Sequence, residues 1–200
     1  MIALTHAHGD HIGGLPRIIE DFHPSELWVG INPQTDALSR LYQIADENHV
    51  AIRVHVAGDG LDWGGTRIRV LSPPPDWQPT ERRNNDASLT LLVGYGDTRA
   101  LLTGDLEKKM ERFVASESPK ADLLKVAHHG SATSTTPELL AAVHPHFAVI
   151  SAGYQNPFGH PRKAVLDRLH AADVRIYRTD LQGAVTFLLD GKTVEARVQP

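Results

Sequence analysis

The stretch Thr5-His6-Ala7-His8-Gly9-Asp10-His11 places three histidines and one aspartate within six positions, directly after the apolar run 1–4. Imidazole nitrogens and carboxylate oxygens are ligands that zinc and similar divalent ions take in proteins. A lone histidine is usually a surface residue or a satisfied core residue. Four potential ligands in one tight turn are costly to hold together without a cation, so the stretch predicts a metal site.

The composition is that of an ordinary globular domain. The chain has 200 residues, of which 41% are hydrophobic and 22% charged, and this is enough for one domain spanning residues 1–200 with a substantial core. The net charge of -4 gives no bulk attraction to nucleic acid, so any such contact needs a local basic patch. The chain has no cysteine, which excludes disulfides and thiolate zinc sites and leaves histidine, carboxylate and backbone groups as metal ligands.

The sequence shows neither a membrane span nor a signal peptide. Its apolar runs fall far short of the roughly 20 residues that cross a bilayer. The first residues lack a basic segment followed by a long apolar stretch. We therefore expect the chain to be soluble as written, although a ligand motif that starts at residue 6 has almost nothing before it to support it.

Hydrophobic periodicity and turn signals predict strands interleaved with helices, plus hairpins. The pattern predicts a mixed α/β (α+β) fold in which sheets are sandwiched by helices. Segments 58–60 and 63–65 have turn composition, and 179–183 has loop composition. The expected strands are 1–4, 26–30, 51–56, 67–71, 88–93, 98–102, 121–126, 147–151, 174–177, 184–189 and 193–198. The expected helices are 12–22, 33–48, 106–116, 137–143 and 162–171.

Four places share one arrangement, in which a strand ends and a polar turn follows. They are the opening motif, Asp105, the pair His128-His129, and His160. Side chains at the ends of neighbouring strands converge at one sheet edge, so these separate stretches can build a single site.

The spacing of the opening motif fits two metal ions. His6 and His8 are two residues apart and can hold a first ion, while Asp10 and His11 in the following turn can hold a second. A carboxylate with two oxygens can bridge both ions, and Asp105 is the natural candidate. Two adjacent divalent ions favour hydrolysis of phosphate esters.

H-x-H-x-D-H with a later T-G-D resembles the metallo-β-lactamase-fold hydrolases. The whole ordered set of motifs resembles, more narrowly, the soluble domain of the ComEC family of competence-type DNA-uptake channels. This resemblance implies an αββα sandwich, a dinuclear metal site and a nuclease acting on the DNA strand that is not taken up. The motifs that carry it are Asn84-Asn85-x-x-Ser88, Leu102-Thr103-Gly104-Asp105, the segment 122–131 ending in His128-His129-Gly130-Ser131, Asn156-Pro157-Phe158-Gly159-His160-Pro161 and Thr179-Asp180-Leu181-Gln182-Gly183-Ala184.

Carried over residue by residue, the resemblance assigns three sets of residues, with zinc or manganese as the two ions. His128 and His129 match H-H-G-S without showing which ring faces the metals. Lys125 and Ser131 have simpler alternatives, a solvated strand end and a turn residue. The metal set is His6, His8, Asp10, His11, Asp105 and His160. The catalytic set is Asp10, His128 and His129, and the substrate-binding set is Asn85, Ser88, Lys125 and Ser131.

Two features depart from the family pattern. Where many such enzymes have a histidine before T-G-D, this chain has Asn84-Asn85-Asp86, so one metal site is expected to be weaker or completed by an amide, by Asp86 or by water. Oxygen ligands shift the preference from zinc toward manganese or magnesium. The strands that normally precede the motif are also missing, which predicts an N-terminally truncated sandwich with an exposed edge at residues 1–4.

Three functions remain open at this stage. The first is a DNA phosphodiesterase or nuclease, with single- or double-stranded DNA and a membrane channel domain of a longer, membrane-associated parent protein as partners. The second is another hydrolase of the same fold, acting on a thioester, lactone or β-lactam. The third is a non-catalytic, metal-stabilised domain that binds DNA or docks on a channel, with Arg82-Arg83 and Arg162-Lys163 as a phosphate-contacting rim.

Overall fold

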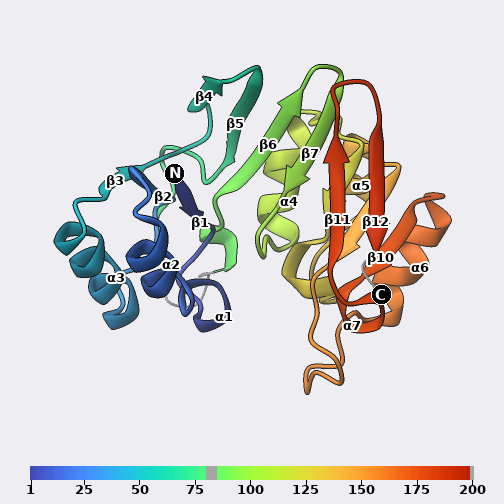
Figure 1. Ribbon diagram of the computed structural model, residues 1–200. Coiled ribbons are helices and arrows are strands. Elements are labelled where there is room, and N and C mark those ends of the chain that lie inside the picture. Colours follow the sequence, from blue (N-terminus) through green and yellow to red (C-terminus); the bar gives the residue numbers. More distant parts are fainter. Residues whose placement is uncertain (80–84, 199–200) are drawn as a thin grey trace.

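The computed structural model describes residues 1–79 and 85–198, and it shows two sheets stacked between two layers of helices (Figure 1). The described strands are β1 (Ile2–Leu4), β2 (Glu26–Val29), β3 (Ala51–Val54), β4 (Gly60–Trp63), β5 (Thr66–Ser72), β6 (Thr90–Tyr95), β7 (Thr98–Leu102), β8 (Leu123–Lys125), β9 (Phe147–Ile150), β10 (Arg175–Arg178), β11 (Val185–Leu189) and β12 (Val194–Val198). The α-helices are α1 (Gly9–Ile12), α2 (Leu15–Phe22), α3 (Asp36–Glu47), α4 (Lys108–Ser116), α5 (Pro137–Val143), α6 (Lys163–Ala171) and α7 (Thr179–Gln182).

The smaller sheet is parallel, in the order β1-β2-β3, and the larger is mixed, in the order β10-β9-β8-β7-β6-β5-β4. Three clusters of buried side chains hold the layers together. Leu4 and Leu27 pack under α2 and α3, Trp28 and Leu91 pack between the sheets, and Leu124 packs under α4, α5 and α6. These are the four layers of the expected αββα sandwich.

Strand β1 lies at the edge of the smaller sheet and pairs with β2 alone among the described residues. The exposed edge expected at residues 1–4 is therefore present. The ligand motif leaves the sheet directly from this edge strand.

Strand β7 runs through the middle of the larger sheet toward the end where the ligand motif lies. It is central in the larger sheet, antiparallel to β6 and parallel to β8. Thr103, Gly104 and Asp105 follow its last residue, so the strand delivers Asp105 to the end of the sheet where the ligand motif lies.

The structure corrects three sequence-based expectations. The sequence predicts one helix over 12–22, but the structure has two. Helix α1 starts inside the motif at Gly9, and Gly13-Gly14 separate its end from the start of α2. Residues 60–63 form β4, whose pairing with β5 overrides the turn composition around it. Residues 179–182 form the helical turn α7, stabilised when the Gln182 side chain accepts a hydrogen bond from the Arg178 amide at 2.7 Å.

The predicted closing hairpin is confirmed as β11–β12, which forms a two-stranded sheet of its own. Asp190 supports its turn by accepting hydrogen bonds from the amides of Lys192 and Thr193. Phe187 packs its ring against Phe147 of β9 and Tyr177 of β10. Among the described residues, no helix combines the length and apolar character needed to cross a bilayer.

Candidate metal centre

Helix α1 is built from the ligand motif itself. His8 has extended backbone, and its carbonyl accepts hydrogen bonds from the amides of His11 and Ile12, which starts the helix at Gly9. Asp10 and His11 thus lie on a helical turn, whereas His6 and His8 lie on the extended segment before it. The sequence placed this helix after the motif, and the structure shows that its first turn carries two of the ligand residues.

His6 is the most enclosed of these histidines. Its Nδ1 lies 3.2 Å from the Thr5 hydroxyl and 3.4 Å from the Ser88 hydroxyl, and its Nε2 shares a hydrogen bond of 3.0 Å with His8 Nδ1. Burial, reinforced by the neighbouring His11 ring, lowers the pKa of His6 from 6.5 to about 3. The ring is therefore neutral at physiological pH, which is the form that binds metals.

Asp105 is a buried carboxylate held from several sides. Its amide donates to the Ser88 hydroxyl at 3.0 Å, and Lys125 Nζ lies 3.6 Å from its Oδ1. Burial raises the pKa of Asp105, but the adjoining His11 ring, whose Nε2 lies 3.3 Å from Oδ2, and nearby positive charges, Lys125 first among them, outweigh burial and hold the pKa well below its usual range. The group is therefore an anion that needs cationic partners.

Asp10, His11, Asp105 and His129 each present one ligand atom to a common point. These four atoms lie within 4.8 Å of one another. Asp105 Oδ2 is 3.3 Å from His11 Nε2 and 3.5 Å from His129 Nε2. Asp10 Oδ2 is 3.2 Å from His129 Nε2. Two carboxylates and two imidazoles at this spacing form a ligand set that suits a divalent cation.

Unpaired buried atoms in this cluster show that a metal ion fits it. His11 Nε2, His129 Nε2 and Asp105 Oδ1 are buried without a hydrogen-bond partner in the described part of the chain. Buried polar atoms are normally paired, because an unpaired one costs about 1–3 kcal/mol. A cation that takes these atoms as ligands would remove that cost. His6 and His8 lie beside this cluster: a hydrogen bond of 3.0 Å joins His6 Nε2 to His8 Nδ1, and 3.9 Å separates His6 Nε2 from Asp105 Oδ2.

His128 and His129, which the sequence left undistinguished, have different surroundings in the structure. Both have left-handed backbone, with φ of 50° and 53°, and their side chains point in different directions. His129 Nδ1 is fixed 2.7 Å from the Ser151 carbonyl, so its Nε2 faces the cluster. His128 Nδ1 lies 3.6 Å from Glu107, away from the cluster. Left-handed backbone in residues other than glycine is costly and is concentrated at functional sites.

His160 lies beside the metal cluster rather than in it. Its ring stands 6.0 Å from that of His128, and Asn156 fixes its backbone through both amide and carbonyl. The four-residue group of converging ligand atoms contains His129 and not His160. The sequence assigned His160 as a last metal ligand from its position after a strand and before a helix, and this assignment stays a prediction. Its unpaired, buried Nδ1 stays available to a ligand or substrate.

The four residues expected to bind substrate have different surroundings. Ser88 is fully buried, and its hydroxyl faces the Asp105 amide and the His6 ring rather than the open pocket. Lys125 donates to the Gly104 carbonyl at 3.0 Å and faces Asp105 rather than being a solvated strand end. Asn85 contacts Glu107 and His128. Ser131 faces Thr133, within the turn after His129.

The region that replaces the missing histidine is partly described. Asn84 lies outside the described residues, as do Arg82 and Arg83. Asn85 and Asp86 belong to a short 3-10 turn, and both have partners at Glu107: the Asn85 amide lies 3.3 Å from its carboxylate, and Asp86 accepts from its backbone amide at 3.0 Å. These contacts of the turn therefore lead to Glu107 and His128 rather than to the His6–His8 pair.

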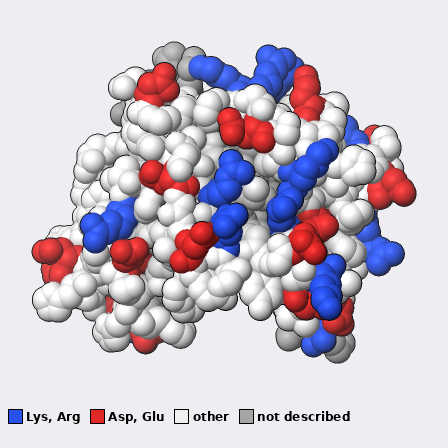
Figure 2. Space-filling view, turned by 90° about the horizontal axis from the view of Figure 1, so that it is seen from above, with Lys and Arg blue, Asp and Glu red and all other residues white. Residues whose placement is uncertain are grey.

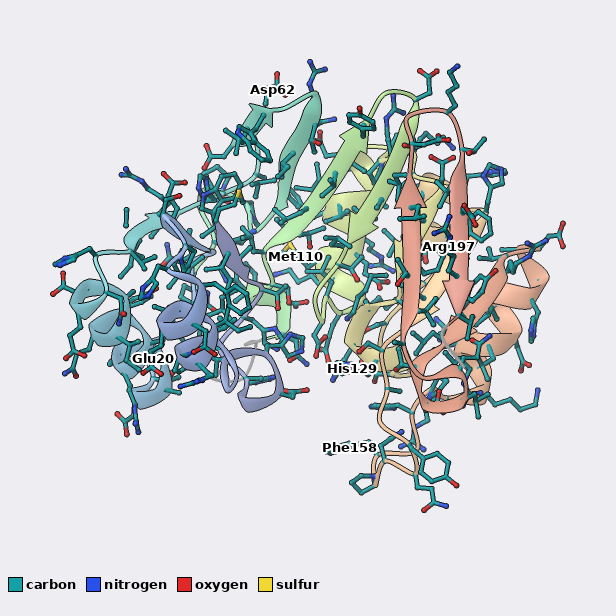
Figure 3. All side chains as sticks on the ribbon, viewed as in Figure 1. Glu20, Asp62, Met110, His129, Phe158 and Arg197 are labelled. Atoms are coloured by element: carbon teal, nitrogen blue, oxygen red, sulfur yellow. The ribbon has the colours of Figure 1, made fainter. Side chains whose placement is uncertain are left out.

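A pocket of about 460 Å³ opens over the cluster. Metal-site residues form its floor, and the loop that follows β9 forms its wall. The exposed ring of Phe158 lies on this loop and stacks on His160, with the ring centres 6.0 Å apart. Figure 3 shows Phe158 on the projecting loop and His129 at its base. The pocket is lined by His8, Asp10, Asp105, His128, His129, Ser151, Ala152, Gly153, Asn156, Phe158 and His160.

Sequence reasoning missed three contributors to this site. Thr5 links the rings of His6 and His11 through one hydroxyl, at 3.2 and 3.0 Å. Ser151 orients His129 through its carbonyl, and Phe158 supplies an aromatic wall. A backbone carbonyl leaves no trace in the sequence, whereas an aromatic residue in a Gly- and Pro-rich loop is a signal that could have pointed to Phe158.

This fold and this site define a class of protein. Residues 2–154 match the model of the metallo-beta-lactamase superfamily, and the chain belongs to that superfamily.

Curated relatives of the chain include competence and recombination proteins. The chain is 35% identical to ComE operon protein 3 of Bacillus subtilis (strain 168), over 100% of this chain and 26% of that protein. It is 33% identical to competence protein ComA of Neisseria gonorrhoeae, over 98% of this chain and 26% of that protein. It is 34% identical to recombination protein 2 of Haemophilus influenzae, over 92% of this chain and 21% of that protein. The chain thus spans about a quarter of the length of the relatives it matches.

Solved structures agree on the fold. A putative metal-dependent hydrolase from Parabacteroides distasonis superposes with a TM-score of 0.55 at 18% identity, covering 90% of this chain and 76% of that one. The diiron β-hydroxylase CmlA from Streptomyces venezuelae superposes with a TM-score of 0.61 at 13% identity, covering 98% of this chain and 44% of that one. At these identities the likeness concerns the fold alone.

Proposed function

We propose that this chain is a metal-dependent phosphodiesterase that cleaves DNA in competence-type DNA uptake, with two divalent ions, zinc or manganese, as cofactors. The observation that carries the proposal is the convergence of Asp10, His11, Asp105 and His129, with unpaired ligand atoms, beneath an open pocket that Asp10, Asp105 and His129 line. The similarity to competence proteins supports DNA as the substrate. It also supports a membrane channel domain as a partner within a longer protein.

The ligand residues divide into two sets in this proposal. His6 and His8 would hold one ion, Asp10, His11 and His129 the other, and Asp105 lies between the two sets and would contact both. When bound, such a pair of ions lowers the pKa of a water molecule and neutralises the oxygens of an in-line displacement at phosphorus. Ser88 and Thr5 hold the ligand side chains in position from behind.

Residues beside the cluster would bind the phosphate and the nucleotide. His128 and His160 line the pocket next to Asp105 and present ring nitrogens that can contact phosphate oxygens. Lys125 places a partly buried ammonium group 3.6 Å from Asp105 Oδ1, where it would balance the charge of the carboxylate. Phe158, at the rim, offers a face for a nucleobase, and stacking of a base on an aromatic ring contributes about 1–3 kcal/mol.

The test is a cleavage assay with metal analysis. The purified chain is incubated with labelled single- and double-stranded DNA and either manganese or zinc, and bound metal is counted by elemental analysis. We expect cleavage of DNA and two ions per chain. Nitrocefin and a thioester serve as control substrates. Turnover of either without DNA cleavage would assign the chain to another hydrolase class, and metal and DNA binding without turnover would make it a binding domain.

A further inference from the structure

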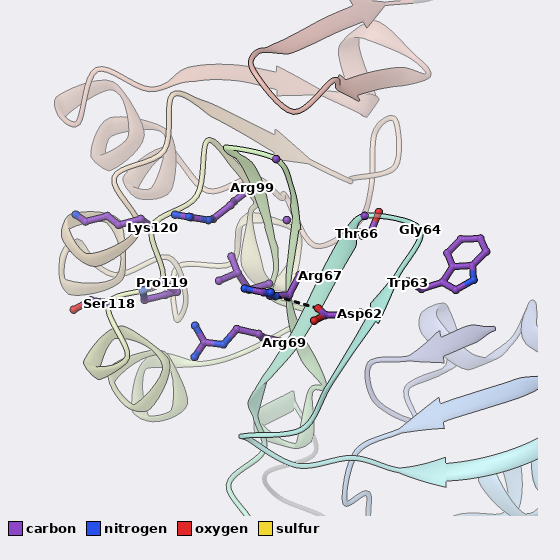
Figure 4. Close-up of a pocket in the computed structure, with 14 residues that line it drawn as sticks. Asp62, Trp63, Gly64, Thr66, Arg67, Arg69, Arg99, Ser118, Pro119 and Lys120 are labelled. Carbon is purple, nitrogen blue, oxygen red and sulfur yellow. Dashed lines mark hydrogen bonds and ion pairs between the residues drawn. The ribbon is translucent and has the colours of Figure 1, made fainter.

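A second pocket lies at the opposite end of the larger sheet. Its volume is about 760 Å³, and it is bounded by the β4–β5 hairpin, by β6 and β7, and by the segment after α4 (Figure 4). Figure 2 looks onto this end of the molecule and shows Lys and Arg side chains gathered around a hollow. The cationic residues that line the pocket are Arg67, Arg69, Arg99 and Lys120.

Strand register builds the centre of this pocket. Arg67 of β5 pairs with Gly94 of β6, and Gly94 pairs with Arg99 of β7, so the two arginines flank a residue without a side chain. A Cβ built on Gly94 would lie 3.6 Å from Cγ of Arg99, in ordinary contact, so the stem of Arg99 lies against this glycine. The result is a slot with one guanidinium group on each side.

The charges in the pocket are not balanced. Arg67 pairs with Asp62 at 3.0 Å, and Arg69 reaches Glu117 only at 3.9 Å. Within the described ranges, neither the Arg99 guanidinium nor the Lys120 ammonium has an ion-pair partner. Asp97 and Asp122 lie in the adjoining hollow that shares these two residues, but the Asp122 carboxylate is engaged by the Arg99 backbone amide at 2.8 Å.

We propose that this pocket binds phosphate groups of a nucleic-acid strand, as a binding site separate from the metal centre. Guanidinium groups match phosphate oxygens with paired hydrogen bonds, and three of the four cations here are arginines. Four cations in one hollow stand out in a chain with a net charge of -4. The positive charge of the pocket therefore favours a polyanion as its ligand. The guanidinium groups, which donate paired hydrogen bonds, favour phosphate.

The position of the pocket relates it to the proposed function. Arg99 lies near the start of β7 and Asp105 follows its end, so the two sites are roughly 15–20 Å apart at about 3.3 Å per residue. A strand held in the pocket would be retained while another part of it is cleaved at the metal centre. The inference extends the proposed nuclease function, but its test does not depend on cleavage.

The test measures binding of a fluorescent single-stranded oligonucleotide of about 20 nucleotides to the full chain by anisotropy, with EDTA present to prevent cleavage. We expect the double variant Arg99→Gln/Lys120→Gln to weaken binding roughly ten-fold at low salt. The slope of log Kd against log salt should fall by about 1.4, or about 0.7 for each phosphate that the variant no longer neutralises.

A charge control separates this site from general charge effects. Arg17→Gln/Arg40→Gln removes two exposed positive charges from the helices over the smaller sheet. This variant should bind like the unmodified chain. Equal weakening by this control, or no effect of the Arg99→Gln/Lys120→Gln variant, would overturn the proposal.

Two further outcomes of the binding experiment would each overturn the proposal. Absence of binding by the unmodified chain at low salt would overturn the phosphate site, while the cleavage assay would still test the nuclease function on its own. Competition by polyglutamate as strong as that by unlabelled oligonucleotide, at equal charge, would mean that the pocket accepts carboxylates equally well. That result would overturn its assignment to nucleic acid.

Discussion

At one end of strand β7 buried and half-buried imidazoles surround Asp105, and at the other end exposed guanidinium groups surround a slot beside Arg99. The first site is fixed from behind by Thr5, Ser88 and the Ser151 carbonyl, so each ligand has few orientations. The second has flexible side chains in solvent, whose interactions are screened by salt. One fold thus holds a rigid site, for which we propose chemistry, and an adaptable site, for which we propose binding. Substitutions should therefore have large effects at the first and graded effects at the second.

The largest effect is expected for Asp105→Ala. This change removes a carboxylate shared by both ligand sets, so at least one metal ion per chain should be lost, and DNA cleavage should fall by roughly 10³-fold or more. Elemental analysis and the cleavage assay measure both. Asp97→Ala, at the far end of β7, is the matched control and should keep both ions. Unchanged metal content in Asp105→Ala would rule out the bridging role.

A smaller effect is expected for Ser88→Ala. The hydroxyl accepts from the Asp105 amide and contacts His6, so its loss should weaken metal affinity by about 10–100-fold while the ligands remain. Metal titration followed by calorimetry measures the change. Ser116→Ala, which removes an exposed hydroxyl at the end of α4, is the control. Equal metal affinity in the Ser88 variant would show that the hydroxyl does not position the ligands.

Phe158→Ala tests the aromatic wall of the pocket over the metal cluster. If the ring stacks on a nucleobase, the variant should raise KM by about five-fold or more with little change in kcat, because the ring binds substrate away from the reacting atoms. Steady-state kinetics on single-stranded DNA measures both constants. The exposed ring of Tyr154 lies on the same loop but does not line the pocket, so Tyr154→Ala is the comparison. A fall in kcat alone would contradict the stacking role.

The smallest effect concerns stability rather than chemistry. Glu111, on α4, is buried and accepts hydrogen bonds from the amides of Thr135 and Thr136 at the start of α5. Burial raises the pKa of Glu111 from 4.5, despite these hydrogen bonds and the nearby Arg168. The protonated carboxyl therefore contributes to the free energy of unfolding below pH 4.5, the pKa of the unfolded chain. This contribution is lost as pH rises through the pKa of the folded chain.

Glu111→Gln removes this titration. Between about pH 4 and pH 7 the variant should lose less stability than the unmodified chain, by about 1.4 kcal/mol for each unit by which the pKa is raised. Urea denaturation at both pH values measures the difference. Glu138→Gln, an exposed change in the first turn of α5, is the control. Parallel pH profiles for Glu111→Gln and the unmodified chain would contradict the raised pKa.

Much of the fold could be predicted because its signals are local. Thr136 caps α5 as its position before Pro137 predicts, and Asp190-Gly191 marks the β11–β12 hairpin. The failures came where pairing or packing overrode composition. Strand β4 exists because β5 pairs with it, and its own residues carry turn signals. The break between α1 and α2 depends on Gly13, whose added Cβ would lie 2.6 Å from the Gly9 carbonyl.

By itself, the sequence determined the ligand types and their grouping, since histidines and carboxylates at strand ends have few other uses when they are this dense. Only the tertiary structure decided which of them converge. Adjacent residues such as His128 and His129 diverge because left-handed backbone turns their side chains apart, and Asp105 meets His11 because β7 and β1 end at the same side of two stacked sheets. The arginine slot is likewise invisible in the sequence, because Arg67 and Arg99 become neighbours only through strand register across Gly94.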